Sequence, residues 1–193
     1  MSRELVTQLK PVFDHHLAKH VTFRNLSRAD AFPLFQATRH PDFNRFLLWV
    51  APVQESDIMP QVDKLVREGA LGNAVVLSIC EKDTAAWLGL AIIKPFRDGL
   101  ELSLYLHPST WNKGIVFTTG RAVIEVMMQN SPGTPIYSRV HPGNRRMKKI
   151  FSHYHFEAVE GEAAVHDAHG QLELEVYLLN QTAWQPFTEV RSY

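Results

Sequence analysis

Residues 100–107 alternate strictly between two kinds of side chain, and this pattern restricts the fold more than any other in the chain. The even positions from 100 to 106 are leucines, and the odd positions are Glu101, Ser103, Tyr105 and His107. Successive side chains of a strand point to opposite faces, so one face of this segment is apolar and the other is polar. From Gly114 onward apolar residues recur at helical spacing. A half-buried strand therefore passes through a short loop directly into an amphipathic helix.

The rest of the chain predicts an α/β domain over residues 1–193, with residues 1–19 as an N-terminal helical extension and 181–193 as a tail. Further strands are expected at Val21–Leu26, Ala74–Cys80, Trp87–Ile93, Ile136–Val140, Phe156–Val165 and Leu172–Leu179. Helices are expected at Glu4–His20, broken or kinked by Pro11; at Arg28–Trp49, interrupted by Pro33 and Pro41; and at Gln54–Gly69, Gly114–Gln129 and Asn144–Tyr154.

Charge and cysteine content exclude several classes of function. The formal net charge is zero, which argues against a generally basic surface for nucleic acid or membrane. No segment approaches the roughly 20 apolar residues of a bilayer span. The lone Cys80 cannot form an internal disulfide. We therefore expect a cytoplasmic protein without a nucleic-acid or membrane partner.

Histidine is frequent, with ten residues, but the pattern does not predict a metal centre. His16 and His20 are spaced to share one helical face, which could hold zinc. No third ligand accompanies them at a convincing spacing, so we expect a solvated helix face and no metal.

The loop between the alternating strand and the next helix could hold a phosphate. The stretch Leu104–Phe117 reads LYLHPSTWNKGIVF, with the helix beginning near Lys113 and Gly114. The first amides of a helix have no partner within it, and the helix dipole attracts anions there. Glycine allows close approach of the backbone, and lysine adds positive charge. An ordinary strand-to-helix turn would show the same features.

This stretch resembles motif A of the GNAT superfamily. That motif has arginine or glutamine first, then two residues, glycine, one residue, and glycine or alanine. The residues at these three positions here are Trp111, Gly114 and Val116. The tryptophan, with His107 and Pro108 upstream, is similar to the RimJ/RimL branch.

A second block, Ile136–Phe156, reads IYSRVHPGNRRMKKIFSHYHF and resembles motif B of the same superfamily. The match rests on Asn144, Arg145, Arg146 and Phe156. Together the two motifs extend the resemblance over roughly residues 20–180.

The resemblance implies a mixed, mostly antiparallel sheet, splayed between its fourth and fifth strands and flanked by helices, that binds acetyl-CoA in the opening. It implies that the pantetheine arm pairs with the fourth strand and that main-chain amides hold the pyrophosphate. The residues so implied are Leu104, Tyr105 and Leu106 for the arm, Trp111, Asn112, Lys113, Gly114, Ile115 and Val116 for the pyrophosphate, and Asn144 near the lower arm.

The implied reaction is direct attack of a primary amine, from a peptide N-terminus or a small molecule, on the thioester. Such an amine must first lose a proton, so a positioned carboxylate or histidine can serve as general base. Glu101 is the first candidate, and His107 is the second. A surface or salt-bridged glutamate is the alternative for Glu101.

Aromatic residues before Pro52 are candidates for the acceptor pocket. Phe43, Phe46 and Trp49 recur at helical spacing, which core packing would also explain. In the family this region shapes the acceptor site, so Arg45, Phe46 and Trp49 are expected to bind the acceptor. Relatives often pair, which makes a homodimer plausible.

Several positions depart from the family pattern and keep a second hypothesis open. Phe151 stands where many members have a tyrosine proposed to protonate the coenzyme thiolate, which leaves that proton donor unassigned. Met147 and Val116 replace smaller residues, and His155 replaces a glycine. The alternative is therefore a catalytically impaired coenzyme A-binding regulatory or interaction module of the same fold.

Overall fold

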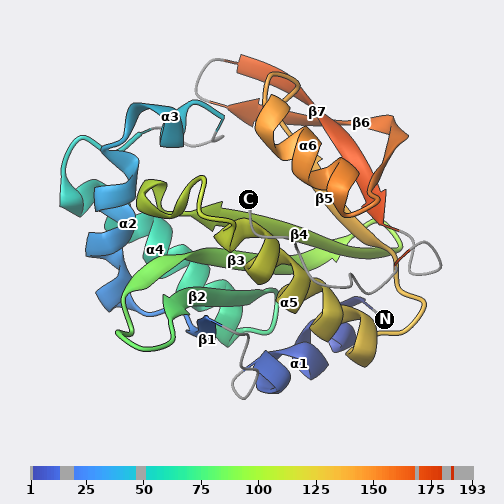
Figure 1. Ribbon diagram of the computed structural model, residues 1–193, viewed down its shortest axis with the longest axis horizontal. Helices are drawn as coiled ribbons and strands as arrows, with labels where there is room; N and C mark the ends of the chain where they lie inside the picture. The colour runs from blue at the N-terminus through green and yellow to red at the C-terminus, as the bar shows by residue number, and fades with distance from the viewer. Residues whose placement is uncertain (1, 14–19, 47–50, 168–169, 180–183, 185–193) are drawn as a thin grey trace.

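The structure is a computed structural model that describes residues 2–13, 20–46, 51–167, 170–179 and 184. In these residues a seven-stranded sheet, in the order β1-β2-β3-β4-β5-β7-β6, is covered by helices on both faces (Figure 1). The strands are β1 (Val21–Asn25), β2 (Val75–Glu81), β3 (Trp87–Phe96), β4 (Gly99–Leu106), β5 (Ile136–Val140), β6 (Glu157–Asp167) and β7 (Gly170–Leu179).

The helices fall on the two faces of this sheet and at its divided end. They are α1 (Ser2–Phe13), α2 (Ala31–Thr38), α3 (Pro41–Asn44), α4 (Glu55–Ala70), α5 (Ile115–Asn130) and α6 (Arg145–His153), with short 3₁₀ turns η1 (Arg28–Asp30) and η2 (Pro108–Thr110). Figure 1 shows α1 and α5 in front of the sheet and α2 and α4 behind it.

The sheet divides between β4 and β5. The other neighbouring strands are antiparallel, whereas β4 and β5 run parallel and pair only at Leu100 with Ile136 and at Glu101 with Tyr137. Just beyond this pairing, the Ser138 hydroxyl donates to the Leu102 carbonyl at 2.9 Å. Past that bond the two strands diverge. The expected mixed sheet with a splay between its fourth and fifth strands is confirmed.

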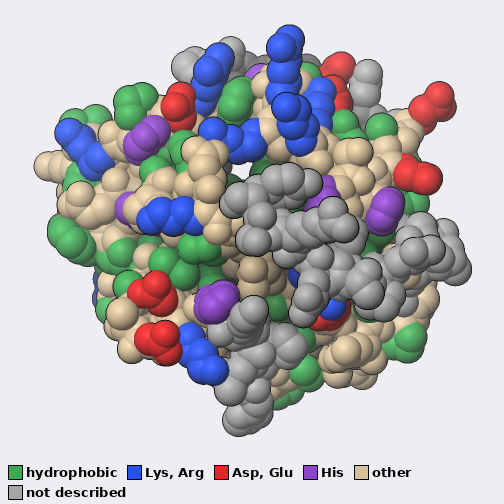
Figure 2. Space-filling view, in the orientation of Figure 1, with side chains coloured by type: hydrophobic (Ala, Val, Ile, Leu, Met, Phe, Trp, Pro, Cys, Tyr) green, Lys and Arg blue, Asp and Glu red, His purple; other side chains and the backbone are tan. Residues whose placement is uncertain are grey.

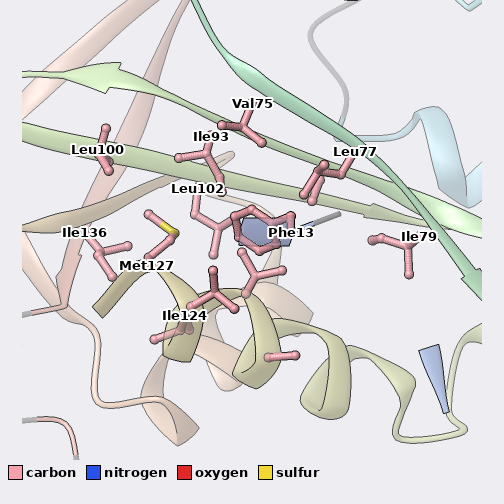
Figure 3. Close-up of a cluster of buried hydrophobic side chains, with 14 of the residues drawn as sticks. Phe13, Val75, Leu77, Ile79, Ile93, Leu100, Leu102, Ile124, Met127 and Ile136 are labelled. Carbon is pink, nitrogen blue, oxygen red and sulfur yellow. The ribbon is translucent and has the colours of Figure 1, made fainter. Parts of the chain in front are cut away.

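Two apolar clusters hold the helices to the sheet. On the front face, α1 contributes Phe13 and α5 contributes Ile124 and Met127, which pack against the leucine face of β4 and its neighbours (Figure 3). On the other face, α2 and α4 pack on Val76 and Leu90. Burying each large aliphatic side chain contributes roughly 1.5–3 kcal/mol, so both clusters fix the backbone around the splay.

Most of the expected elements occur within a residue or two of their expected limits, and the prolines account for the main differences. Pro33 was expected to interrupt a helix, but it lies in the first turn of α2, where its missing N–H removes no intrahelical bond. Pro41 interrupts the helical region as expected, because α2 ends at Thr38 and Pro41 starts the separate helix α3, which ends at Asn44. Pro11 lies inside α1, which continues to Phe13. His15, His16 and Trp49 lie outside the described residues.

Candidate active site

A cavity of about 710 Å³ opens where β4 and β5 separate. Its walls come from both faces of the sheet, because the gap between the strands connects them. The space-filling view shows the surface hollowed between α3 and α6, with lysine and arginine side chains around the upper rim (Figure 2).

The N-terminus of α5 presents unused amides to this cavity. Gly114 is the N-cap residue, with a left-handed φ of 73°, and the helix starts at Ile115. The amides of Trp111 and Lys113 donate to carbonyls of the preceding turn. Within the described residues, the amides of Asn112, Gly114, Ile115 and Val116 have no acceptor. A side chain at position 114 would meet no atom within 4 Å, so the space beside it is open. This combination fits the pyrophosphate of a coenzyme.

The expected pyrophosphate residues do not all reach the cavity. Trp111, Asn112, Gly114 and Val116 line it, whereas Lys113 and Ile115 are not among the lining residues. The coenzyme contacts of all six stay predictions.

The free edge of β4 offers a backbone to pair with an extended ligand. Leu104, Tyr105 and Leu106 pair with β3 on one side, and β5 has moved away on the other. The Leu106 carbonyl already accepts from the Trp111 indole at 3.0 Å. The backbone groups of Leu100 and Leu102 face β5, and alternation along the strand puts those of Leu104 and Leu106 on the same edge. The Tyr105 carbonyl instead lies against Gly89 of β3. The pairing capacity of this edge therefore lies mainly at Leu104 and at the Leu106 amide. All three residues line the cavity, as expected of residues beside a pantetheine arm.

Asn144 lies across the gap, at the N-cap of α6. Its side-chain oxygen accepts from the Met147 amide at 3.2 Å, which satisfies one of the unpaired donors of that helix. Its amide nitrogen has no acceptor among the described residues, and the side chain lines the cavity. The residue can therefore cap α6 and donate to a ligand at the same time.

Glu101 lies at the bottom of the splay in a network of charges. The side chain is 3% exposed. Arg139 of β5 donates from Nε to one carboxylate oxygen at 2.8 Å and from Nη2 to the other at 3.0 Å. The Lys94 ammonium lies 3.3 Å from the carboxylate. A bidentate pair of this kind holds the carboxylate in one orientation.

Tyr105 stands beside Glu101 on the same face. Burial raises the pKa of the Tyr105 hydroxyl, and the Glu101 charge raises it further. The hydroxyl thus stays protonated at neutral pH and can donate a hydrogen bond inside the cavity.

The residues expected to bind the acceptor are only partly described. Arg45 and Phe46 both line the cavity, and the Arg45 guanidinium lies 5.3 Å from the Phe46 ring centre. Phe43 also lines the cavity and is buried in the apolar cluster, so it combines the two roles considered for it. Trp49 lies outside the described residues. The helical spacing that grouped these aromatics does not continue past Asn44, where α3 ends.

Sequence reasoning did not single out several polar residues of the cavity. Arg139 and His141 project from one face of β5 and its continuation, and Lys94 and Lys64 come from β3 and α4. The His141 ring lies 5.2 Å from the Phe46 ring. Alternation along residues 137–141 could have indicated the first two. Glu101, which pairs with Arg139, lies 38 residues away from it in the sequence. No pattern of neighbouring residues could therefore predict this ion pair.

The remaining proton-transfer candidates are poorly placed. Phe151 lines the cavity and has no proton to donate. The Tyr154 hydroxyl donates to the Phe117 carbonyl at 2.6 Å, which fastens the end of α6 to the first turn of α5. His107 caps η2 by accepting from the Ser109 amide and is not among the cavity-lining residues. Burial and the nearby His40 lower the pKa of His107.

Two findings on the described residues bear on other classes of function. They contain no group of three or more potential metal ligands. None of the helices in the described ranges combines the length and the apolar character that crossing a bilayer requires.

Known protein structures share this fold. A GCN5-related N-acetyltransferase from Brucella melitensis superposes with a TM-score of 0.74 at 13% identity, covering 87% of this chain and 79% of that one. RimL, a ribosomal-protein alpha-N-acetyltransferase in complex with coenzyme A, gives 0.70 at 13% identity and covers 86% and 96%. A ribosomal-protein-S5-alanine acetyltransferase from Vibrio fischeri gives 0.68 at 16% identity and covers 89% and 98%.

The family assignment comes from sequence. No curated protein sequence matches the chain significantly. Residues 20–157, more than half of the chain, match the family described as "Acetyltransferase (GNAT) domain". The match includes the free edge of β4, the cap at Gly114 and the start of α6. The chain therefore belongs to the GNAT acetyltransferase family and is an acetyl-CoA-dependent N-acetyltransferase.

Proposed function

We propose that this enzyme transfers the acetyl group directly to a primary amine, either a peptide N-terminus or a small amine. The observation that supports this most is the cavity at the splay. It runs from the unused amides at Gly114 to Glu101 on the other face of the sheet. A donor and an acceptor can therefore approach each other from opposite faces without sharing an entrance.

The coenzyme side of the cavity holds and orients its ligand through the backbone. The amides of Asn112, Gly114, Ile115 and Val116 would bind the pyrophosphate, and the free edge of β4 at Leu104 and Leu106 would pair with the pantetheine arm. The Asn144 amide would donate to the lower part of that arm. When bound there, acetyl-CoA supplies an activated thioester.

On the acceptor side, Glu101 is the proposed group that attracts the amine and takes up its proton, directly or through water. Arg139 and Lys94 hold the Glu101 carboxylate in place beside the cavity. We expect activity to increase with pH, because a larger fraction of the acceptor then arrives as neutral amine. Arg45 and Phe46 would line the acceptor entrance.

The lone, buried Cys80 supports a cytoplasmic location for this enzyme, since no second cysteine exists to form an internal disulfide.

The test combines turnover with coenzyme binding. The enzyme is incubated with acetyl-CoA and peptides with free N-termini or small amines, while thiol release and acetylated product are measured. Peptides with blocked N-termini serve as the control. Acetylation of free amines alone is the expected result. Coenzyme binding by calorimetry without turnover on any amine would instead favour the impaired module suggested by Phe151, Met147 and Val116.

The variant Gly114→Ala checks the coenzyme side separately. A side chain at φ 73° strains the backbone, at a cost of roughly 1–2 kcal/mol, and displaces the amides that would bind phosphate. The dissociation constant for coenzyme A should rise in calorimetry. An unchanged constant would contradict the placement of the pyrophosphate.

A further inference from the structure

The two faces of the cavity can be separated by strand register. Lys94 and Tyr137 lie opposite Glu101 in the neighbouring strands, and paired residues of a sheet share a face. Side chains two positions further along a strand return to that face, which places Tyr105 and Arg139 there too. The core cluster that contains Ile58 and Val62 of α4 includes Tyr105, so α4 covers this same face. This is the acceptor side.

Positive charge exceeds negative charge among the described residues that line the acceptor side. The cations are Arg45, Lys64, Lys94 and Arg139, and the carboxylates are Asp42 and Glu101. A fifth cation of the cavity, Arg146, lies over the Trp111 ring near the turn at Gly114 and is not counted on this side. The whole chain has no net charge, so this excess belongs to the cavity and is not a property of the protein surface in general.

The inner cations keep unused donors. Arg139 and Lys94 both bind the single carboxylate of Glu101, which cannot neutralise two cations. Arg139 is 16% exposed, so its remaining charge acts in a partly desolvated space where electrostatic interactions are stronger than in water.

The outer cations have no acidic partner. In the part of the chain that the structure describes, neither Lys64 nor Arg45 forms an ion pair, and both are exposed at the cavity. Rim charges of one sign mainly steer and orient an incoming ligand of the opposite sign.

His141 adds another donor. Its Nδ1 accepts from the Gly143 amide at 2.9 Å, so in the neutral ring the proton is on Nε2. His141 therefore offers its Nε2–H group to a ligand in the cavity.

We propose that the acceptor of this enzyme is an amine that also carries a carboxylate: a peptide N-terminus followed closely by acidic residues, or an amino acid. The amine would approach Glu101, and the carboxylate would bind between Lys64 and the spare donors of Lys94 and Arg139. This assignment rests on the proposed acetyl transfer and narrows its substrate class. It also predicts that polyamines are poor acceptors, because four cations would repel them.

The experiment compares matched acceptors on the full-length enzyme. Short peptides share their first residue and carry acidic, neutral or basic residues at positions two to four, and aspartate and spermidine represent small amines. We expect kcat/KM for the acidic peptide to exceed that for the basic one by at least about tenfold, and to fall as ionic strength rises. Aspartate outperforming every peptide would identify the small amine as the source of the carboxylate.

A charge-reversal variant assigns the preference to the cavity. Lys64→Glu should reduce the ratio of acidic to basic peptide by about tenfold or more, since it replaces attraction by repulsion. Lys82→Glu is the matched control, because Lys82 is an exposed lysine in the turn after β2 and does not line the cavity. It should leave the ratio unchanged.

Three results would overturn the proposal. The first is equal use of acidic and basic peptides, and the second is a preference for basic peptides. The third is that Lys64→Glu weakens coenzyme A binding enough to explain its whole effect on kcat/KM, which would assign this lysine to the coenzyme. In the first two cases acetylation still occurs, so the proposed function stands. Turnover of no amine, with coenzyme bound, would contradict the proposed function itself.

Discussion

At the scale of single residues, the buried carboxylate of Asp30 is held by several hydrogen-bond donors. Asp30 is 1% exposed and accepts hydrogen bonds from Arg24 at 2.8 Å, from the Ser27 amide at 2.8 Å and from the Ser78 hydroxyl at 2.9 Å. Asp30 therefore links β1, η1 and β2 on the face of the sheet that α2 and α4 cover. Burial alone would raise the pKa of Asp30, but these donors together hold it below its usual value.

This depressed pKa makes the stability of the protein dependent on pH. The contribution of Asp30 is present above the pKa of an unfolded aspartate, about 3.9, and is lost as pH falls towards the lower folded value. Asp30→Asn should cost about 1–3 kcal/mol at pH 7, because it weakens the buried hydrogen bonds from Arg24, Ser27 and Ser78. Urea unfolding at several pH values measures both effects. Asp83→Asn, in an exposed turn, is the control, and an equal loss in both variants would contradict the prediction.

Glu101 differs from Asp30 because its cationic partners lie at a cavity. We expect Glu101→Gln to lower kcat/KM by about a hundredfold at every pH, the lower end for loss of a general base. The rise of activity with pH should remain, because it comes from the neutral fraction of the acceptor amine. Glu157→Gln, on the exposed side of β6, is the matched control. Thermal unfolding with and without coenzyme A checks that the variant is folded. A kcat/KM close to the wild-type value would contradict the role of Glu101 as general base.

At the scale of elements, the contact between α5 and Tyr154, at the end of α6, helps to fix the position of the turn at Gly114. An added Cβ at Gly120 would lie 2.9 Å from the Tyr154 hydroxyl, which donates to the first turn of α5. Gly120 therefore leaves the space that the Tyr154 ring occupies against α5.

Enlarging this glycine should loosen that contact. Gly120→Ala should destabilise the protein by about 1–3 kcal/mol through overpacking, and adding Tyr154→Phe should restore part of the loss, because it removes the clashing oxygen. Chemical denaturation measures the free energy of unfolding of both variants. Gly69→Ala is the control, since the nearest atoms to its added Cβ are 3.9 Å away. Strictly additive losses in the double variant would rule out the direct contact.

The elements also show what sequence could and could not predict. The alternating leucines defined β4 and its core face, and Gly114 marked the start of α5, because both signals are local in the chain. Pro33 misled, since a proline in the first turn of a helix looks the same as one that ends it. The partners of Glu101 were missed, because the register that joins β3, β4 and β5 depends on residues far apart in sequence.

For the molecule as a whole, the gap between β4 and β5 means that a bound ligand should increase the free energy of unfolding. β4 and β5 pair at only two positions, so a ligand between them would supply contacts that the protein lacks. Coenzyme A at about 100 times its dissociation constant should add about 2.7 kcal/mol to the free energy of unfolding, equivalent to roughly 5–10 °C in melting temperature for a chain of this size. Melting temperatures with coenzyme A, and with pantetheine at the same concentration as the phosphate-free control, measure this stabilisation. Equal shifts with the two ligands would contradict a role for the amides at Gly114.

The hydrogen bond from Ser138 to Leu102 has a consequence for how such an enzyme can change. It stops the separation of the strands at one fixed depth, so the reactive end of any arm laid along β4 arrives at the same spot whatever enters opposite. Exchanges on α3 and α4, which lie away from this bond, would then reshape one entrance of the cavity without moving β4. A single serine thus sets how far the sheet opens, independently of the helices that line the opening.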